Sequence, residues 1–316
     1  MQELDNRDKK ILEQLDLNSR ITFKELGKKL RISKETARFR VLRLKENNYI
    51  KNFITTVHIS NINRFYYKLF FKFHKTTPEI DKRIIKHISN YKSIAYFASL
   101  EGRYDITFLI LSKNIEDLYS FLIPFKEKFG NYILEQEILT LPSVHRFNLR
   151  LNKTTKLTHT KYAEKLQDTK IDQLDKQIIT ELAKDSRISL KDLAKKTKKE
   201  INSVKYRITK LKKSNILGRH VLDINYEKLN LQQVQVDFSL RNHKSIHQLI
   251  NFAAQIPQST FATITLGKYD LALEFLTKDH KELREILNQI KQEFSKEIIQ
   301  QDIFIMEEHS INWFPL

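Results

Sequence analysis

The stretch Ser19-Arg20-Ile21-Thr22-Phe23-Lys24-Glu25-Leu26 recurs 167 residues later as Ser186-Arg187-Ile188-Ser189-Leu190-Lys191-Asp192-Leu193. The match extends without a gap over residues 5–48 and 172–215. Apolar and turn positions recur together with the lysines, which argues against chance similarity between two Lys-rich helices. We therefore interpret the chain as one unit that occurs twice.

The bulk composition limits the class of protein. A chain of 316 residues can form two to four domains of ~100–200 residues. Hydrophobic residues make up 41% and no apolar run approaches the ~18–20 residues of a membrane helix. Cysteine is absent, which excludes disulfides and thiolate metal sites. The N-terminus shows no signal-peptide pattern. We expect a cytoplasmic protein without a membrane partner.

The net charge of +18 predicts an anionic partner. The basic excess is concentrated in residues 1–52, in a linker at 142–170 and in residues 171–219, whereas residues 220–316 are net acidic. A basic excess confined to the repeated segment and the linker favours double-stranded DNA as the partner.

The first half of each unit has the pattern of three helices. Asp5 and Asp172 are placed to cap the first helix, and Thr22 and Glu25 form a capping box at the second. Ser33 is the expected N-cap of the third helix in the first copy, whereas the second copy has Lys198-Lys199-Glu200 there. We therefore expect the second copy to be less stable or less specific.

Three short helices with a tight turn before the third predict a helix-turn-helix, whose last helix enters the DNA major groove. The alternative is a solvated basic face on a purely structural bundle, and the charge in both copies favours DNA. The candidate DNA-binding residues are Arg20, Lys28, Lys29, Ser33, Lys34, Thr36, Arg38, Arg40, Arg43, Arg187, Asn202, Lys205, Tyr206 and Arg207.

The second half of each unit reads as β-α-β-β-α-β. The expected strands are 66–74, 94–100, 104–111 and 132–141, with helices at 78–91 and 115–129. In the second copy they are 233–240, 260–266, 269–276 and 298–306, with helices at 246–256 and 280–294. This order gives an antiparallel sheet with both helices on one face. Candidates to line the uncovered face or the core are Phe70, Phe73, Phe97, Phe108 and Ile110.

A hairpin recurs in both copies as Gly102-Arg103-Tyr104-Asp105 and Gly267-Lys268-Tyr269-Asp270. The chain has only five glycines, so two at the same point indicate backbone geometry that favours glycine. A plain tight turn explains them, and so does the approach of a ligand to the main chain.

The combined pattern resembles the Lrp/AsnC family of transcription regulators. The residues that carry the resemblance are Leu4-Asp5, Asp8, Ile11-Leu12, Asn18-Ser19-Arg20-Ile21, Glu25-Leu26, Ser33, Arg40, Leu44, Ile50 and the Gly-x-Tyr-Asp hairpins. The resemblance implies an α+β chain with two winged-helix-like helix-turn-helix domains (1–52 and 171–219). It also implies two ferredoxin-like effector domains of RAM type (53–141 and 220–316), alternating with them around a linker at 142–170.

The resemblance also implies a function and a site. Family members control transcription, often in response to an amino acid bound near the hairpin, which carries over to Gly102, Tyr104, Asp105, Gly267, Tyr269 and Asp270. The family usually has a small hydroxyl residue before the glycine, where this chain has Glu101 and Leu266. We expect a homo-oligomer in which the two effector domains of one chain pair as a pseudo-dimer.

Two other functions are open. Siroheme decarboxylases resemble this family and also pair two such units, but the ten histidines here are scattered and form no metal or cofactor motif. A DNA-coating architectural protein would use the basic linker. We expect a sequence-specific regulator that is not an enzyme and needs no cofactor or metal.

Overall fold

The computed structural model describes residues 4–152, 155–162 and 166–315. The chain forms two compact units. One unit contains the two helix-turn-helix segments and the other contains the two α/β segments. Domains of the same kind therefore pack together, although the two kinds alternate along the sequence. The α+β class and the two repeated architectures are as predicted.

The helix-turn-helix unit contains two copies of a three-helix bundle. The first copy has α1 (Asn6–Leu17), α2 (Phe23–Leu30) and α3 (Lys34–Glu46). The second has α6 (Gln173–Lys184), α7 (Leu190–Thr197) and α8 (Ile201–Lys213). The apolar stripe of α3, formed by Ala37, Val41 and Leu44, is buried. Its equivalents Val204 and Leu211 are buried on α8.

The helix caps distinguish the two copies. Thr22 forms the predicted capping box with Glu25, and the Ser33 hydroxyl accepts from the Thr36 amide at 2.9 Å. Helix α8 begins after Glu200, whose side chain makes no cap hydrogen bond. A missing side-chain cap costs about 1 kcal/mol of helix stability, so the first turn of α8 is less stable than that of α3.

A two-stranded antiparallel ribbon joins the two helix-turn-helix copies. It consists of β1 (Ile50–Val57) and β7 (Leu217–Ile224), and Ile54 lies opposite Val221. These two residues are equivalent positions in the repeat, as are Ser19 and Ser186, whose hydroxyl oxygens are 2.7 Å apart. The two copies are therefore related by a pseudo-twofold axis.

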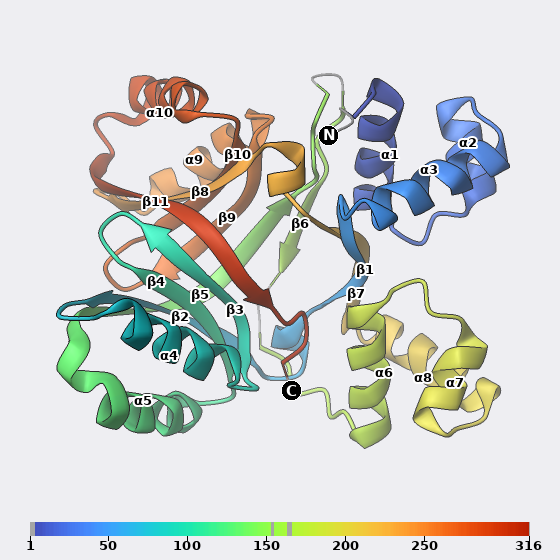
Figure 1. Ribbon diagram of the computed structural model, residues 1–316, viewed down its shortest axis with the longest axis horizontal. Coiled ribbons are helices and arrows are strands. Elements are labelled where there is room, and N and C mark those ends of the chain that lie inside the picture. Colours follow the sequence, from blue (N-terminus) through green and yellow to red (C-terminus); the bar gives the residue numbers. More distant parts are fainter. Residues whose placement is uncertain (1–3, 153–154, 163–165, 316) are drawn as a thin grey trace. The chain divides into compact units, whose positions relative to one another are not determined.

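The α/β unit contains two β-α-β-β-α-β copies (Figure 1). The first has β2 (Phe65–Phe73), α4 (Pro78–Ser89), β3 (Ile94–Glu101), β4 (Ile106–Ser112), α5 (Ile115–Phe129) and β5 (Ile133–Phe147). The second has β8 (Gln232–Leu240), α9 (Lys244–Gln255), β9 (Ser259–Leu266), β10 (Leu271–Thr277), α10 (His280–Phe294) and β11 (Ile298–Ile311). Short elements are η1 (Ile59–Asn61), η2 (Gly130–Tyr132), η3 (Glu227–Leu229) and β6 (His159–Tyr162).

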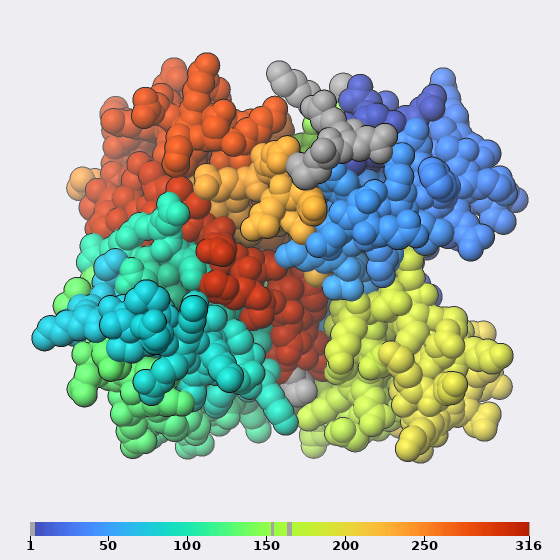
Figure 2. All heavy atoms as spheres, viewed as in Figure 1, coloured from blue at the N-terminus to red at the C-terminus, as the bar shows by residue number. Residues whose placement is uncertain are grey.

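The sheets of the two copies close on each other. Each copy forms a four-stranded antiparallel sheet, β5-β2-β4-β3 or β11-β8-β10-β9. Strand β3 pairs with β11 and β5 pairs with β9, so eight strands form a closed ring. In Figure 2 the red atoms of β11 lie between turquoise atoms of the first copy and orange atoms of the second. Closure leaves neither sheet edge of this ring unpaired, which removes the usual route to aggregation.

Two apolar layers hold the first copy. Phe97, Phe108 and Ile110 are buried beneath α4 and α5, and Phe73 packs against that cluster. Phe70 lies on the other face, in a cluster with Tyr104, Tyr269 and Phe304. Of the five candidates, only Phe70 therefore lines the face that the helices leave uncovered, and the paired second copy covers it.

Candidate DNA-binding face and effector hairpins

The third helix of the first copy exposes one continuous face. Lys34, Glu35, Arg38 and Phe39 are exposed, whereas the stripe opposite them is buried. Phe39 is 64% exposed, although phenylalanine side chains are usually buried. The candidates Ser33 and Thr36 bond to each other through their hydroxyls at 2.9 Å and fix the start of the helix.

The third helix of the second copy exposes a different set of side chains. Ile201, Asn202, Lys205 and Tyr206 face solvent, and Tyr206 is 68% exposed. Tyr206 occupies the position equivalent to Phe39, so both helices present an aromatic ring at the same point. The sequence prediction included Tyr206 and missed Phe39. The repeat itself carried the signal, because the two positions align without a gap.

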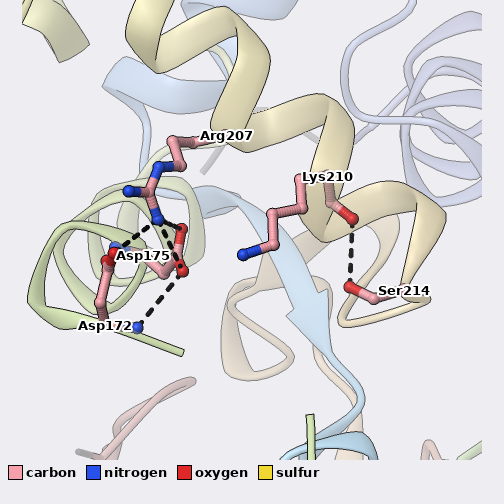
Figure 3. A network of polar contacts seen from close by, with 5 residues as sticks. All are labelled: Asp172, Asp175, Arg207, Lys210 and Ser214. Carbon is pink, nitrogen blue, oxygen red and sulfur yellow. Dashed lines mark hydrogen bonds and ion pairs between the residues drawn. The ribbon is translucent and has the colours of Figure 1, made fainter. Parts of the chain in front are cut away.

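Three of the candidate arginines are engaged inside their own domains. Arg40 bonds Asp5 at 2.8 Å and Asp8 at 2.9 Å, and Arg43 bonds Asp8 at 2.6 Å. Figure 3 shows the guanidinium of Arg207 turned toward Asp172 at 2.6 Å and Asp175 at 3.2 Å. These pairs tie the third helix to the first helix in each copy.

Hydrogen bonds between the partners shift the pKa values of the groups in these ion pairs toward the charged forms. The bond to Asp5 is the largest effect that raises the pKa of Arg40. The Asp175 amide is the largest effect that lowers the pKa of the Asp172 carboxyl. Because each guanidinium has carboxylate partners on or beside the first helix, Arg40, Arg43 and Arg207 brace the third helix, and their contact with DNA stays a prediction.

Arg187 lies between the two helix-turn-helix copies. Its Nε donates to the Ser19 carbonyl at 2.6 Å, and its guanidinium lies 5.0 Å from the Phe23 ring centre and 4.8 Å from that of Phe53. Burial lowers its pKa. Its equivalent, Arg20, is exposed. The repeat alone predicted the same role for both, and the structure separates them: Arg187 joins the copies and Arg20 faces solvent.

Lysines flank the exposed helices. Lys28 and Lys29 are exposed on α2, and Lys29 donates to the Gln14 side chain at 3.2 Å. In the second copy an open hollow of about 470 Å³ lies at the start of α8. It is lined by Lys191, Ala194, Lys195, Lys198, Lys199, Glu200 and Ile201. Four lysines beside an uncapped helix start suit a phosphate group. The sequence prediction did not include them.

The two hairpin glycines make a close approach to a strand of the other copy. Gly102 has φ +146° and Gly267 has φ +141°, a region that favours glycine. A Cβ on Gly102 would lie 2.5 Å from the Ile303 carbonyl oxygen, and one on Gly267 would lie 2.6 Å from the Leu139 side chain. Backbone conformation and packing between the copies therefore account for both glycines.

The other hairpin candidates also have partners within the fold. Tyr104 and Tyr269 are fully buried, and the Tyr269 hydroxyl donates to Asp302 at 2.5 Å. Asp105 accepts from the Phe73 amide at 2.6 Å, and Asp270 accepts from the Leu240 amide at 2.7 Å. Their role in binding an effector stays a prediction.

Two negative findings apply to the described residues. No group of three or more histidine or acidic side chains among them could hold a metal ion. Among the helices that the structure describes, none is long and apolar enough to cross a membrane.

The fold and the exposed third helices define a DNA-binding regulator of the helix-turn-helix class, and comparison with known proteins agrees. A family model described as a winged helix-turn-helix DNA-binding domain matches residues 4–51. One described as an AsnC-type helix-turn-helix domain matches residues 171–212.

Curated relatives extend the match beyond those domains. The transcriptional regulator Ptr1 of Methanocaldococcus jannaschii is 31% identical over 119 residues, 38% of this chain and 79% of the relative. The regulator LysM of Sulfurisphaera tokodaii is 30% identical over 118 residues, 37% of this chain and 81% of the relative. The chain belongs to the Lrp/AsnC family of transcription regulators.

Crystal structures of a siroheme decarboxylase resemble the chain over nearly its whole length. The siroheme decarboxylase NirDL superposes with a TM-score of 0.65 at 12% identity, covering 98% of this chain and 94% of that one. At this identity the likeness is one of fold alone.

Proposed function

We propose that one chain regulates transcription in the cytoplasm by binding a two-part DNA site whose halves differ in sequence. The observation that carries the proposal is the pseudo-twofold pairing of the two helix-turn-helix copies, which present unlike exposed faces on α3 and α8. A twofold arrangement of reading helices suits two inverted half-sites. Unlike side chains on the two helices suit unlike half-sites.

The first copy is the better reader of sequence. Arg38 is exposed and has no hydrogen-bonded partner among the described contacts, so its guanidinium is free for a bidentate bond with guanine. The Phe39 ring beside it suits contact with a thymine methyl group. Lys28 and Arg20 are placed to contact phosphates, which position the protein without reading bases.

The second copy acts mainly as a clamp. Its hollow gathers Lys191, Lys195, Lys198 and Lys199 near the start of α8. Asn202, Lys205 and Tyr206 are available for base contacts, and Asn suits adenine. Four lysines in one place favour phosphate contact and a steep salt dependence.

An effector is part of the proposal. By analogy with the family, an amino acid or other small molecule would bind near the hairpins at Gly102 and Gly267, and the chain would form homo-oligomers through its effector unit. Adding a panel of amino acids to the DNA-binding measurement tests both, with oligomer size followed by light scattering.

The main experiment is selection of bound sites from random DNA by the full chain, followed by competition binding. A regulator should prefer its selected site over random DNA by ~10³-fold or more. The selected site should consist of two unlike halves and bind one chain. Equal affinity for all DNA would instead support an architectural protein, and a site with two identical halves would refute the unlike-half proposal.

A second candidate function is siroheme decarboxylation, which the whole-length likeness to NirDL favours. The helix-turn-helix family matches and the exposed charged faces support regulation instead. Titration with siroheme separates the two. A change in porphyrin absorbance at stoichiometric protein, together with loss of a carboxyl group from the tetrapyrrole, would establish the enzyme.

A further inference from the structure

Two equivalent positions of the repeat meet at the centre of the α/β unit and carry different residues. The Nζ of Lys68 donates to the side-chain oxygen of Gln235, its counterpart 167 residues further on. Lys68 is 5% exposed and Gln235 is 1% exposed. In the helix-turn-helix unit the equivalent meeting, Ser19 with Ser186, is between identical residues.

The surroundings of this contact are also unlike. On its own sheet Lys68 lies opposite Leu109 and Leu139, so the first copy provides it with apolar neighbours. Gln235 lies opposite Glu274. Two positions further along β8, Asp237 lies opposite Asp302. The second copy therefore gathers three carboxyl groups on the inner face, and the first copy contributes the ammonium group.

One of the three carboxyl groups is incompletely hydrogen-bonded, whereas Glu274 accepts from the Gln233 side chain and Asp302 accepts from the Tyr269 hydroxyl. Asp237 is fully buried; its Oδ1 accepts from the Gln235 amide at 2.6 Å, and its Oδ2 has no hydrogen-bond partner. Burial raises the pKa of Asp237 to about 7 and also raises that of Glu274, while the charge of Lys68 opposes the rise in both. The Gln235 side chain bonds both Lys68 and Asp237, so the ammonium group of the first copy is linked through Gln235 to the carboxyl groups of the second copy.

We propose that buried Lys68 makes the first effector domain pair with the second. A pair of two first domains, or of two second domains, is less stable. Two first copies would place two Lys68 ammonium groups at the contact that Lys68 and Gln235 now share. The first copy has one counterpart of the three carboxyl groups, because Glu137 lies opposite Phe70 where Asp302 lies opposite Asp237. Glu137 alone would then face the two ammonium groups. Breaking a buried charge pair by removing one partner is strongly destabilising.

A pair of two second copies is disfavoured for the opposite reason. It would gather Asp237, Glu274 and Asp302 from each copy around one axis without the Lys68 ammonium group, whose charge favours the ionised forms of Asp237 and Glu274. The hairpins add a second unlike contact, because Lys268 donates to the Tyr104 hydroxyl at 3.1 Å, whereas Arg103 at the equivalent position binds Glu135 of its own copy. Only the unlike pair satisfies both sets of side chains.

The first test is a double-mutant cycle on the full chain, read by urea unfolding about two pH units above the Asp237 pKa of about 7, where this carboxyl group is ionised. Lys68→Met keeps the apolar stem and removes the charge, so we expect the unfolding equilibrium constant to rise at least about tenfold. Adding Asp237→Asn should recover most of that loss, because a neutral amide no longer needs the cation. The control is Lys72→Met on the same strand, whose half-exposed ion pair lies within the first copy and should matter little. Additive effects of Lys68→Met and Asp237→Asn would refute the proposal.

The second test measures selection directly. Lys68→Glu makes both inner faces of a chain acidic, and Glu274→Lys in another chain leaves Lys68 facing a second ammonium group. Each variant alone is internally mismatched, but mixing them lets the first copy of the Lys68→Glu chain pair with the second copy of the Glu274→Lys chain. We expect the mixture to regain the wild-type resistance to urea that each variant lacks alone, and native mass spectrometry to show that the stabilised species contains the two variants in a 1:1 ratio. Failure of the mixture to form it, with both variants as stable as wild type, would overturn the selection.

Discussion

The hydroxyl oxygens of Ser19 and Ser186 lie 2.7 Å apart, both fully buried, at the axis that relates the two helix-turn-helix copies. The same repeat places Lys68 against Gln235 at the axis of the effector unit. One axis has kept identical residues and the other has diverged. A fused chain allows this divergence, because each position of the pair can change independently.

Arg187 should hold the two helix-turn-helix copies together. Replacing it with alanine removes its bonds to the Ser19 and Ile21 carbonyls and its packing on Phe23 and Phe53. We expect a loss of about 1–3 kcal/mol in the free energy of unfolding, measured by urea denaturation. The matched control is Arg20→Ala at the equivalent exposed position, which should leave stability unchanged. Equal losses in both variants would contradict the asymmetry.

Replacing the N-cap residues of α3 and α8 should lower the stability of the protein by unequal amounts. Ser33→Ala removes the side-chain bond to the Thr36 amide and should cost about 1 kcal/mol. Glu200→Ala at the equivalent position removes no cap bond and should cost much less. Thermal unfolding followed by circular dichroism measures both. A larger loss for Glu200→Ala would show that α8 is capped in another way.

Gly102 should resist substitution. Alanine there must adopt a φ near +146° and place its Cβ 2.5 Å from the Ile303 carbonyl oxygen. We expect a loss of about 1–3 kcal/mol. Gly130 provides the control, because its φ is −55° and a Cβ there meets nothing within 4 Å. If Gly102→Ala is as stable as Gly130→Ala, the hairpin does not need glycine for packing.

DNA-binding measurements should distinguish a residue that reads the base sequence, Arg38, from one that contacts phosphates, Lys28. Arg38→Ala should lower the preference for the selected site by about 1–3 kcal/mol and leave binding to random DNA nearly unchanged. Lys28→Ala should weaken binding to all DNA alike and reduce the slope of affinity against salt. Fluorescence anisotropy at several salt concentrations measures both. Identical behaviour of the two variants would refute the division of roles.

Asp237 should make stability depend on pH. Its pKa is raised by burial to about 7 in the folded chain, above the ordinary value of 3.8. Between those values the folded state holds a proton that the unfolded state releases, so this group's contribution to stability falls as pH rises from about 4 to 7. The difference in unfolding free energy between wild type and Asp237→Asn should follow that trend. A difference that stays constant with pH would contradict it.

Much of the fold could be predicted from the sequence. The helices predicted at 115–129 and 280–294 have these limits in the structure, since apolar spacing and caps at Asn114 and Asp279 are local signals. The last strands, β5 and β11, run further than predicted, to Phe147 and Ile311. Their extensions pair with β9 and β3 of the other copy, and no local pattern announces a partner so distant in sequence.

The sequence was sufficient to predict that one unit occurs twice, the three helices and the β-α-β-β-α-β order of each copy, and the family, but not the strands β1 and β7. The predicted features depend on local periodicity, caps and matching positions. The sequence could not show which of the equivalent arginines, Arg20 or Arg187, faces solvent, or that Lys68 contacts Gln235. Both outcomes depend on contacts between residues more than 160 positions apart, where small differences between the copies are resolved by burial and charge.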